Sequence, residues 1–456
     1  MTTFDCVWLL TESGWKSRQR VNISPDGLIE SIQDADQTTA DHQLNGWVVP
    51  GMANVHSHAH QRLIAGMTGW REPGQSSFWS WRQQMYRALD ELTANDLRTV
   101  AAYLYAELLE GGYTSTGEFH YAHRLNGASP MESSLALLDA ANASGMALTL
   151  LPVWYCYGGF GRIPLDERQR SFTLSGDEIE ELIGSLMQEV GQKRRSDYHV
   201  IGLAPHSLRA VELKDLGALL DRLPQLPVHL HIAEQTGEVE SCLEHSGKRP
   251  IELLCASGLP NSDWCLIHAT HCIAAELDRL AQADVVVGLC PSTEADLGDG
   301  IFPAAEWQLR GGRLAIGSDS NVMTSAPGEL RQLEWSQRLT LQQRNVLIES
   351  GASHLGTSLW CQASKGGARA LRQTAGLLTI GCRADLVQLR ADHPMLQGLS
   401  PDQALDSFVM SNQCDMIDSV WVAGRCKVRG GRHLDHESLS EAFADLRGRL
   451  MASVQT

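Results

Sequence analysis

Eight short apolar runs, each bounded by polar or turn-forming residues, recur through the middle of the chain. They read GWVVPGMANVH, TSTGEFHY, ALTLLPVW, HVIGLAPHS, PVHLHIAE, CLIHATH, VVVGLCPS and RLAIGSDS. Most are separated by stretches with helical spacing, such as the one from Thr93, a capping residue followed by acids, to Gly112. Strands that alternate with helices pair in parallel, so the pattern predicts an α/β fold with a (β/α)8 TIM-like barrel over residues 51–377.

The two ends of the chain show a different pattern. Residues 1–50 and 378–435 contain short strand-like runs separated by turns rich in Gly, Asp and Asn. We expect these runs to pair into one small β-sandwich domain formed by both chain ends, although two unrelated edge hairpins would give the same pattern. Residues 436–456 include an amphipathic stretch, which predicts a C-terminal helix with a packing role.

Composition narrows the class of protein. The 456 residues are 43% apolar and 20% charged, as in ordinary globular proteins. The 37 basic and 54 acidic residues give a net charge of −17, which argues against nucleic acid or an anionic membrane as a partner. The 11 cysteines include no C-x-x-C pair, the amino terminus lacks a basic export signal, and no apolar run is long enough to span a membrane. We therefore expect a cytoplasmic protein.

Histidine is the residue that stands out, with 17 in the chain and several at the ends of predicted strands. His56 and His58 close the first run, and alternate residues of a strand point to one face, so both imidazoles can reach one cation. An H-x-H pair alone is weak evidence, because two incidental histidines are about as common. Later runs end in further candidate ligands, namely His229, His231, His268 and Asp319.

These side chains would converge, because the carboxyl ends of parallel strands meet at one mouth of a barrel. Imidazoles and a carboxylate around an open coordination position suit one catalytic divalent cation, with Zn2+ favoured over Fe2+. Within the fifth run, alternation does not choose between His229 and His231, because the two share a face. One of them is a candidate ligand and the other a candidate structural histidine.

The segments PGMANVHSHAHQ, HIAE, HAT and GSDS resemble the amidohydrolase superfamily, specifically its deaminase branch with one metal ion. The resemblance implies a ligand set of His56, His58, His231 and Asp319. It thus selects His231 over His229. Branches with two metal ions carry a carboxylated lysine or a glutamate at the end of the fourth strand, whereas this chain has no lysine between Lys16 and Lys193 and its HVIGLAPHS run contains neither residue.

The resemblance also implies a reaction, the hydrolysis of a C=N group with release of ammonia. A bound divalent cation lowers the pKa of water from about 15.7 to about 7, which makes hydroxide available near neutral pH. We expect Glu234 to carry a proton from the attacking water to the leaving nitrogen, its alternative role being an ion-pair partner at the barrel mouth. His268 is expected to hydrogen-bond the hydroxide or the developing oxyanion. Asp319 is expected to accept a proton from the water as well as to bind the metal.

Further segments, among them SFWSWRQQMYR, GYTSTGEFHY and HSLRAV, resemble one member of that branch and imply a small substrate with two carboxylates and a cationic formimino group. Carboxylates are bound best by the planar fork of arginine. Arg82 and Arg209 are therefore the predicted clamp, although a single arginine is more often a solvated charge. The predicted neutral contacts to the substrate are Gln61, Tyr121 and His206.

Two other functions compete with this interpretation. A deaminase or chlorohydrolase of the same branch that acts on a guanine-, triazine- or adenosine-like ring would need a flat aromatic slot in place of the arginines. A non-catalytic relative that has lost its metal is disfavoured, because every ligand type is present together with Glu234 and His268. Relatives imply a homodimer, for which the sequence has no coiled-coil signal.

Overall fold

A computed structural model describes residues 1–67, 89, 91–192, 198–411 and 415–454 of the chain. Its central sheet has the strand order β10-β11-β12-β13-β5-β6-β7-β8, with β9 paired to β7, and all of its pairings are parallel. The bounds of these strands are β5 (Met52–Ser57), β6 (Tyr113–His120), β7 (Ala147–Trp154), β8 (Val200–Ile201), β9 (Ala204–Pro205), β10 (Val228–Ile232), β11 (Trp264–His268), β12 (Val286–Leu289) and β13 (Arg313–Ile316).

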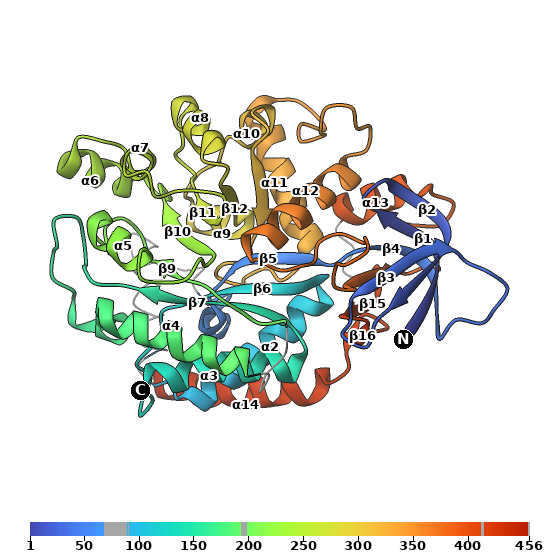
Figure 1. The fold of residues 1–456 in the computed structure, drawn as a ribbon, viewed down its shortest axis with the longest axis horizontal. Coiled ribbons are helices and arrows are strands. Elements are labelled where there is room, and N and C mark those ends of the chain that lie inside the picture. The colour runs from blue at the N-terminus through green and yellow to red at the C-terminus, as the bar shows by residue number, and fades with distance from the viewer. Residues whose placement is uncertain (68–88, 90, 193–197, 412–414, 455–456) are drawn as a thin grey trace.

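Hydrogen bonds join the two ends of this sheet. The backbone N–H of His229 donates to the carbonyl of Leu203 at 3.0 Å, and the N–H of His231 donates to the carbonyl of His206 at 3.2 Å. The strands therefore curl until β10 meets the segment around β9, and the helices lie around them (Figure 1). The predicted (β/α)8 fold class is confirmed.

The helices begin where the sequence supplies capping residues. Thr93 accepts the backbone N–H of Asp96 and donates its own N–H to the Asp96 carboxylate, so the helix predicted from Thr93 starts there. The helices are α2 (Ala94–Glu110), α3 (Pro130–Ser144), α4 (Gly176–Gly191), α5 (Leu213–Leu220), α6 (Thr236–Ser246), α7 (Pro250–Ala256), α8 (Ala274–Gln282), α9 (Pro291–Leu297), α10 (Ala304–Leu309), α11 (Ala326–Leu341), α12 (Leu355–Ala370), α13 (Pro401–Met410) and α14 (His436–Val454), with 3-10 turns η1 (Ala59–Ile64) and η2 (Glu167–Phe172).

Both ends of the chain contribute strands to a second sheet, at one side of the barrel in Figure 1. Its order is β17-β16-β15-β14-β4-β1-β2-β3, with β14 antiparallel to β4. The strands are β1 (Thr2–Thr11), β2 (Gly14–Ile23), β3 (Ile29–Asp34), β4 (His42–Pro50), β14 (Leu386–Leu389), β15 (Ile417–Val422), β16 (Arg425–Arg429) and β17 (Arg432–His433). The two ends are thus one structural element and not two separate hairpins.

The first apolar run differs from its expected form, because it contains two strands and not one. β4 ends at Pro50 in the end sheet, and β5 begins at Met52 in the barrel. Gly51 still donates its N–H at 3.0 Å to the carbonyl of Asp385, directly before β14 of the end sheet, whereas Met52 donates to the carbonyl of Gly112, directly before β6, at 3.1 Å. The chain changes sheets across this single peptide bond.

The C-terminal helix α14 packs on α2. Phe443 stacks on Tyr103 with ring centroids 4.3 Å apart. Nδ1 of His436 is 2.8 Å from Oε1 of Glu110, and Arg449 forms an ion pair with Asp96, both on α2. Among the helices that the structure describes, none combines the length and the apolar character that a membrane crossing requires.

Candidate metal centre and active site

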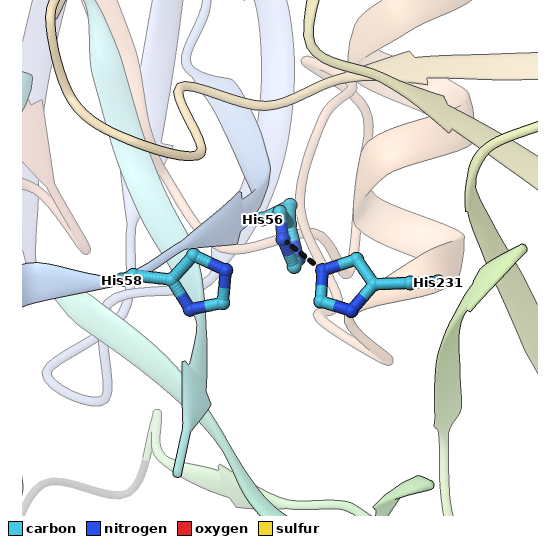
Figure 2. A group of neighbouring side chains, drawn as sticks. All are labelled: His56, His58 and His231. Carbon is cyan, nitrogen blue, oxygen red and sulfur yellow. Dashed lines mark hydrogen bonds between the residues drawn. The ribbon is translucent and has the colours of Figure 1, made fainter. Parts of the chain in front are cut away.

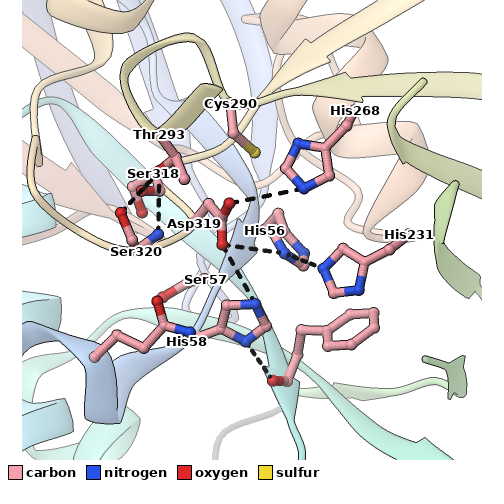
Figure 3. Close-up of polar contacts among 12 residues, drawn as sticks. His56, Ser57, His58, His231, His268, Cys290, Thr293, Ser318, Asp319 and Ser320 are labelled. Carbon is pink, nitrogen blue, oxygen red and sulfur yellow. Dashed lines mark hydrogen bonds and ion pairs between the residues drawn. The ribbon is translucent and has the colours of Figure 1, made fainter. Parts of the chain in front are cut away.

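Five buried polar side chains converge at the carboxyl ends of the barrel strands (Figure 3). His56 lies in β5 and His58 directly follows it, His231 lies in β10, His268 is the last residue of β11, and Asp319 lies three residues after β13. Because every element that supplies these groups is a parallel strand of one barrel, the fold directs all of them to the same mouth.

The three imidazoles of His56, His58 and His231 face one another (Figure 2). The Nε2 atoms of His56 and His231 are 2.9 Å apart, and one nitrogen from each of the three rings lies within 4.8 Å of the others. Burial lowers the pKa of His56 to about 3 and places the pKa of His231 well below its ordinary value. The rings are therefore neutral and present lone pairs, as metal ligands must.

Asp319 completes this cluster on its other side. Its Oδ1 atom is 3.3 Å from Nε2 of His58 and 3.5 Å from Nε2 of His56. Burial alone would raise the pKa of the Asp319 carboxyl, but the neighbouring histidines lower it well below its ordinary range. Three neutral imidazoles and one carboxylate anion fit a divalent cation.

The backbone fixes Asp319 against β5. The N–H of Asp319 donates to the carbonyl of His56 at 2.9 Å, and the N–H of His58 donates to the carbonyl of Asp319 at 3.1 Å. These bonds continue the pairing of β13 with β5, so closure of the barrel itself sets the spacing between the H-x-H pair and the aspartate.

Two of the imidazoles are oriented by backbone carbonyls. Nδ1 of His58 is 2.9 Å from the carbonyl oxygen of Phe119, and Nδ1 of His231 is 3.1 Å from that of His206. When Nδ1 donates its proton to a carbonyl, the lone pair remains on Nε2, the atom that faces the cluster.

His229 has a different environment from His231. Its Nε2 atom lies 2.9 Å from the carbonyl oxygen of Ala370, at the end of α12, and burial lowers its pKa to about 4. The structure thus brings His231 into the cluster of ring nitrogens and directs His229 toward the helix layer.

His268 lies between carboxylates at the edge of the cluster. Its Nε2 atom is 3.7 Å from Oδ2 of Asp319 and 3.9 Å from Oε1 of Glu234, and its Nδ1 atom is 3.3 Å from Oε1 of Glu294. Burial opposes protonation of this ring, but the charges of Glu234, Glu294 and Asp319 raise the pKa of His268 to about 10. The three carboxylates thus favour a protonated His268 that can act as a hydrogen-bond donor.

Strained backbone accompanies the candidate site residues. Ala233, His268, Ala269 and Asp319 have φ angles of 49°, 69°, 49° and 45°. Side chains with a Cβ rarely adopt this left-handed region, and each such residue costs about 1–3 kcal/mol. The fold holds these turns at the ends of three strands, where they direct side chains back over the barrel mouth.

Three of the predicted substrate contacts line the other side of the cluster. Gln61 donates from Nε2 to the Tyr121 hydroxyl at 2.8 Å, and the Tyr121 ring centroid is 4.9 Å from that of His58. The His206 ring lies 5.0 Å from the His231 ring and 4.6 Å from the Tyr155 ring. All three residues are thus adjacent to candidate ligands.

Arg209 is half-buried in a cavity of about 640 Å3 that Glu234 also lines. Burial opposes its charge, but Tyr155 and the carboxylates of Glu238 and Glu234 raise the pKa of Arg209. A permanently charged guanidinium therefore lies beside the candidate proton carrier. The other predicted clamp residue, Arg82, lies outside the described residues.

Two carboxylates beside the site are absent from the sequence-based set. Glu294, in the first turn of α9, contacts His268, and Asp299 accepts a hydrogen bond from Gln235 at 2.9 Å. Burial and the charge of Glu234 raise the pKa of Asp299 to about 7. Both belong to the STEADLGDG segment after β12, whose position at the barrel mouth was the one signal that could have identified them.

Comparison with known sequences gives consistent results. Residues 47–427 match the amidohydrolase family. The formimidoylglutamate deiminase of Pseudomonas aeruginosa is 42% identical over 447 residues, which cover 97% of this chain and 98% of that protein. The 8-oxoguanine deaminase of the same organism is 27% identical, with 89% of each chain covered.

Solved structures show the same fold. An amidohydrolase from Brucella melitensis superposes with a TM-score of 0.93 and 38% identity, covering 99% of this chain and 100% of that one. An atrazine chlorohydrolase from Arthrobacter aurescens, complexed with zinc, superposes with a TM-score of 0.82 at 19% identity, covering 98% and 100% of the two chains. The latter likeness concerns the fold alone.

Proposed function

Because this chain belongs to the amidohydrolase family, we propose that it is a metal-dependent hydrolase that converts N-formimidoyl-L-glutamate to N-formyl-L-glutamate and ammonia, a step of histidine degradation. A hydrolase acting on C–N bonds agrees with the family and with the named function of the Pseudomonas relative. The observation that carries the substrate assignment is the position of Arg209 beside Glu234 in one cavity, next to the cluster of histidines.

The proposed ligands are His56, His58, His231 and Asp319, and the proposed cation is Zn2+, with Fe2+ as the alternative. A cation held there supplies Lewis acidity and lowers the pKa of a water molecule toward neutrality. The donor set supports this assignment, because neutral imidazoles and one carboxylate suit both ions.

Proton transfer is assigned to Glu234. The oxygen of the attacking water forms a bond to the formimino carbon, and the C=N double bond becomes a single bond as Glu234 carries the first water proton to the nitrogen. Glu234 then carries the remaining O–H proton to the same nitrogen, so that the C–N bond breaks, ammonia departs and the oxygen forms the formyl carbonyl. Glu234 suits this role because its carboxylate is partly exposed toward the cavity, where it can reach both the water and the leaving group. Asp319 is a second acceptor for the proton of the attacking water.

His268 is assigned to the oxygen of the attacking water. Its Nε2 atom faces Asp319 and Glu234, the two carboxylates that are proposed to accept protons from that water. An imidazole N–H at that point donates a hydrogen bond to the negative charge that develops on the oxygen during attack.

Recognition of the substrate is assigned to the arginines and their neighbours. Arg209 is proposed to bind one substrate carboxylate, Arg82 the other, and Gln61, Tyr121 and His206 are proposed to donate hydrogen bonds. A small dicarboxylate suits an arginine with a raised pKa in a partly closed cavity, because the guanidinium stays charged there. We further propose that the protein is a cytoplasmic homodimer, which light scattering would test.

The decisive experiment supplies purified protein with N-formimidoyl-L-glutamate and measures ammonia and formamide separately. We expect about one equivalent of ammonia per substrate consumed and no formamide. Release of formamide, or turnover of guanine, cytosine or adenosine but not of N-formimidoyl-L-glutamate, would contradict the proposal. Metal analysis of the same sample should find about one equivalent of zinc or iron.

A further inference from the structure

Glu238 makes two hydrogen bonds that helix capping does not explain. Its carboxylate accepts the backbone N–H of Ala233 at 3.2 Å and that of Glu234 at 3.1 Å. Gln235 caps α6, and a glutamate at the third helical position ordinarily accepts the N–H of the cap residue itself. Here the carboxylate extends past Gln235 and bonds the two residues before it.

These two residues form the turn that presents Glu234 to the site. Ala233 directly follows β10 and has a φ of 49°, a conformation that residues with a Cβ rarely adopt. The turn brings Oε1 of Glu234 to 3.9 Å from Nε2 of His268. Glu238 holds the N–H groups of two successive peptides, one on each side of the Ala233 Cα, so it fixes the direction in which the Glu234 side chain leaves the backbone.

Glu238 also lies close to the charge of Arg209. The carboxylate of Glu238 is buried, and it lines the same cavity as Arg209 and Glu234. Burial raises the pKa of Glu238, while the Arg209 guanidinium lowers it; in return Glu238 helps to raise the pKa of Arg209. The two side chains therefore attract each other, and Glu238 offsets part of the positive charge that a substrate carboxylate would meet.

We propose that Glu238 is a positioning residue of this enzyme. By its hydrogen bonds to the backbone it orients the Glu234 side chain, and by its charge it weakens the attraction of Arg209 for the dicarboxylate. This inference rests on the proposed function. Glu238 would thus connect proton transfer with substrate binding, because its buried carboxylate contacts the turn that carries Glu234 and lines the same cavity as Arg209.

The test uses the metal-loaded enzyme and the isosteric variant Glu238→Gln, with Glu240→Gln on the exposed face of the same helix as a matched control. An amide has only one acceptor oxygen and no charge, so one N–H loses its partner. We expect kcat to fall by about tenfold to a hundredfold. The dissociation constant of N-formyl-L-glutamate, measured by calorimetry, should become smaller by about twofold or more, because Arg209 is no longer offset. Glu240→Gln should match the wild type in both measurements.

A second variant separates the two effects. Glu238→Asp keeps the charge beside Arg209 but shortens its reach to the turn, so kcat should fall while product affinity is unchanged. The proposal is overturned if Glu238→Gln retains kcat within about twofold, or if kcat, product affinity, metal content and melting temperature fall together, as for a merely structural residue. An inactive wild type would overturn the proposed function as well. If the wild type is active and Glu238→Gln has the same kcat, only this inference is overturned.

Discussion

The Nδ1 atom of His268 lies 3.3 Å from the Oε1 atom of Glu294. The same oxygen accepts the backbone N–H of Cys290 at 2.8 Å, so the carboxylate is anchored to the end of β12 and cannot follow a rotation of the imidazole. This bond directs Nε2 of His268 toward Asp319 and Glu234, where the proposed chemistry takes place.

Glu294→Gln is expected to lower kcat/KM by about tenfold or more, because the amide is a weaker partner and can present its NH2 group to His268. Metal content should be unchanged, since Glu294 touches no proposed ligand nitrogen or oxygen. Steady-state kinetics and metal analysis check both points. Asp296→Asn on the exposed side of α9 is the control, and equal losses in the two variants would remove Glu294 from this role.

Arg209→Ala is expected to raise KM by about tenfold to a hundredfold with a smaller change in kcat, because the interaction that it removes binds substrate and transition state alike. The control is Arg162→Ala, which removes an exposed arginine paired with Asp215 and should leave KM unchanged. A catalytic efficiency for Arg209→Ala within about twofold of the wild type would show that the carboxylate clamp is misassigned.

Variants of the two histidines of β10 should behave differently. His231→Ala removes a ring nitrogen from the cluster, so we expect loss of the bound metal and of the stabilisation that the metal gives to the folded state. His229→Gln retains a donor for the carbonyl of Ala370 and should keep its metal. Elemental analysis and melting temperatures, with and without a chelator, distinguish the two. Metal loss in His229→Gln alone would reverse the assignment.

Buried Glu329 predicts a pH dependence of stability. Burial and the charges of Glu294 and Asp319 raise its pKa to about 8, although its hydrogen bonds from Ser292 oppose this shift. Between about pH 4.5 and about pH 8, Glu329 is therefore protonated in the folded state and ionised in the unfolded chain. The resulting stabilisation is complete below the ordinary glutamate pKa of about 4.5 and is lost as the pH rises through about 8.

Glu329→Gln removes this titration, because an amide does not ionise. The glutamine can still accept the Ser292 N–H and donate to the Ser292 hydroxyl, so the hydrogen bonds are kept. The melting temperature of the wild type should therefore fall relative to that of the variant between about pH 5 and about pH 8. A difference that stays constant, or that grows in the opposite sense, would show that Glu329 is ionised in the folded protein.

Much of the fold could be predicted, because regular spacing of apolar runs carries the information about strands and helices. The convergence of His56, His58 and Asp319 followed from their places at strand ends. The choice of His231 over His229 could not follow from alternation, since the two side chains share a face. It depends on how far along β10 each ring lies, and the structure shows this in the place of His231 among the clustered ring nitrogens and in the different carbonyl partners of the two rings.

Other parts of the site lie beyond what spacing can give. Glu238 and Glu294 act from the first turns of helices, where an acidic residue is common for reasons of helix polarity alone. Their roles depend on backbone turns with positive φ, such as that at Ala233, and no pattern of polar and apolar residues marks those turns. The break between β4 and β5 was missed for a related reason, because a change of sheet leaves an apolar run uninterrupted.

That break has a mechanical consequence. The N–H of Gly51 is hydrogen-bonded beside the end sheet and that of Met52 beside the barrel. Only Gly51 separates β4 from β5, the strand that carries His56. A tilt of the end sheet would therefore reach β5 and the cluster of candidate ligands directly, because no loop separates the two strands. We therefore expect the rigidity of the end sheet to help to fix the position of His56.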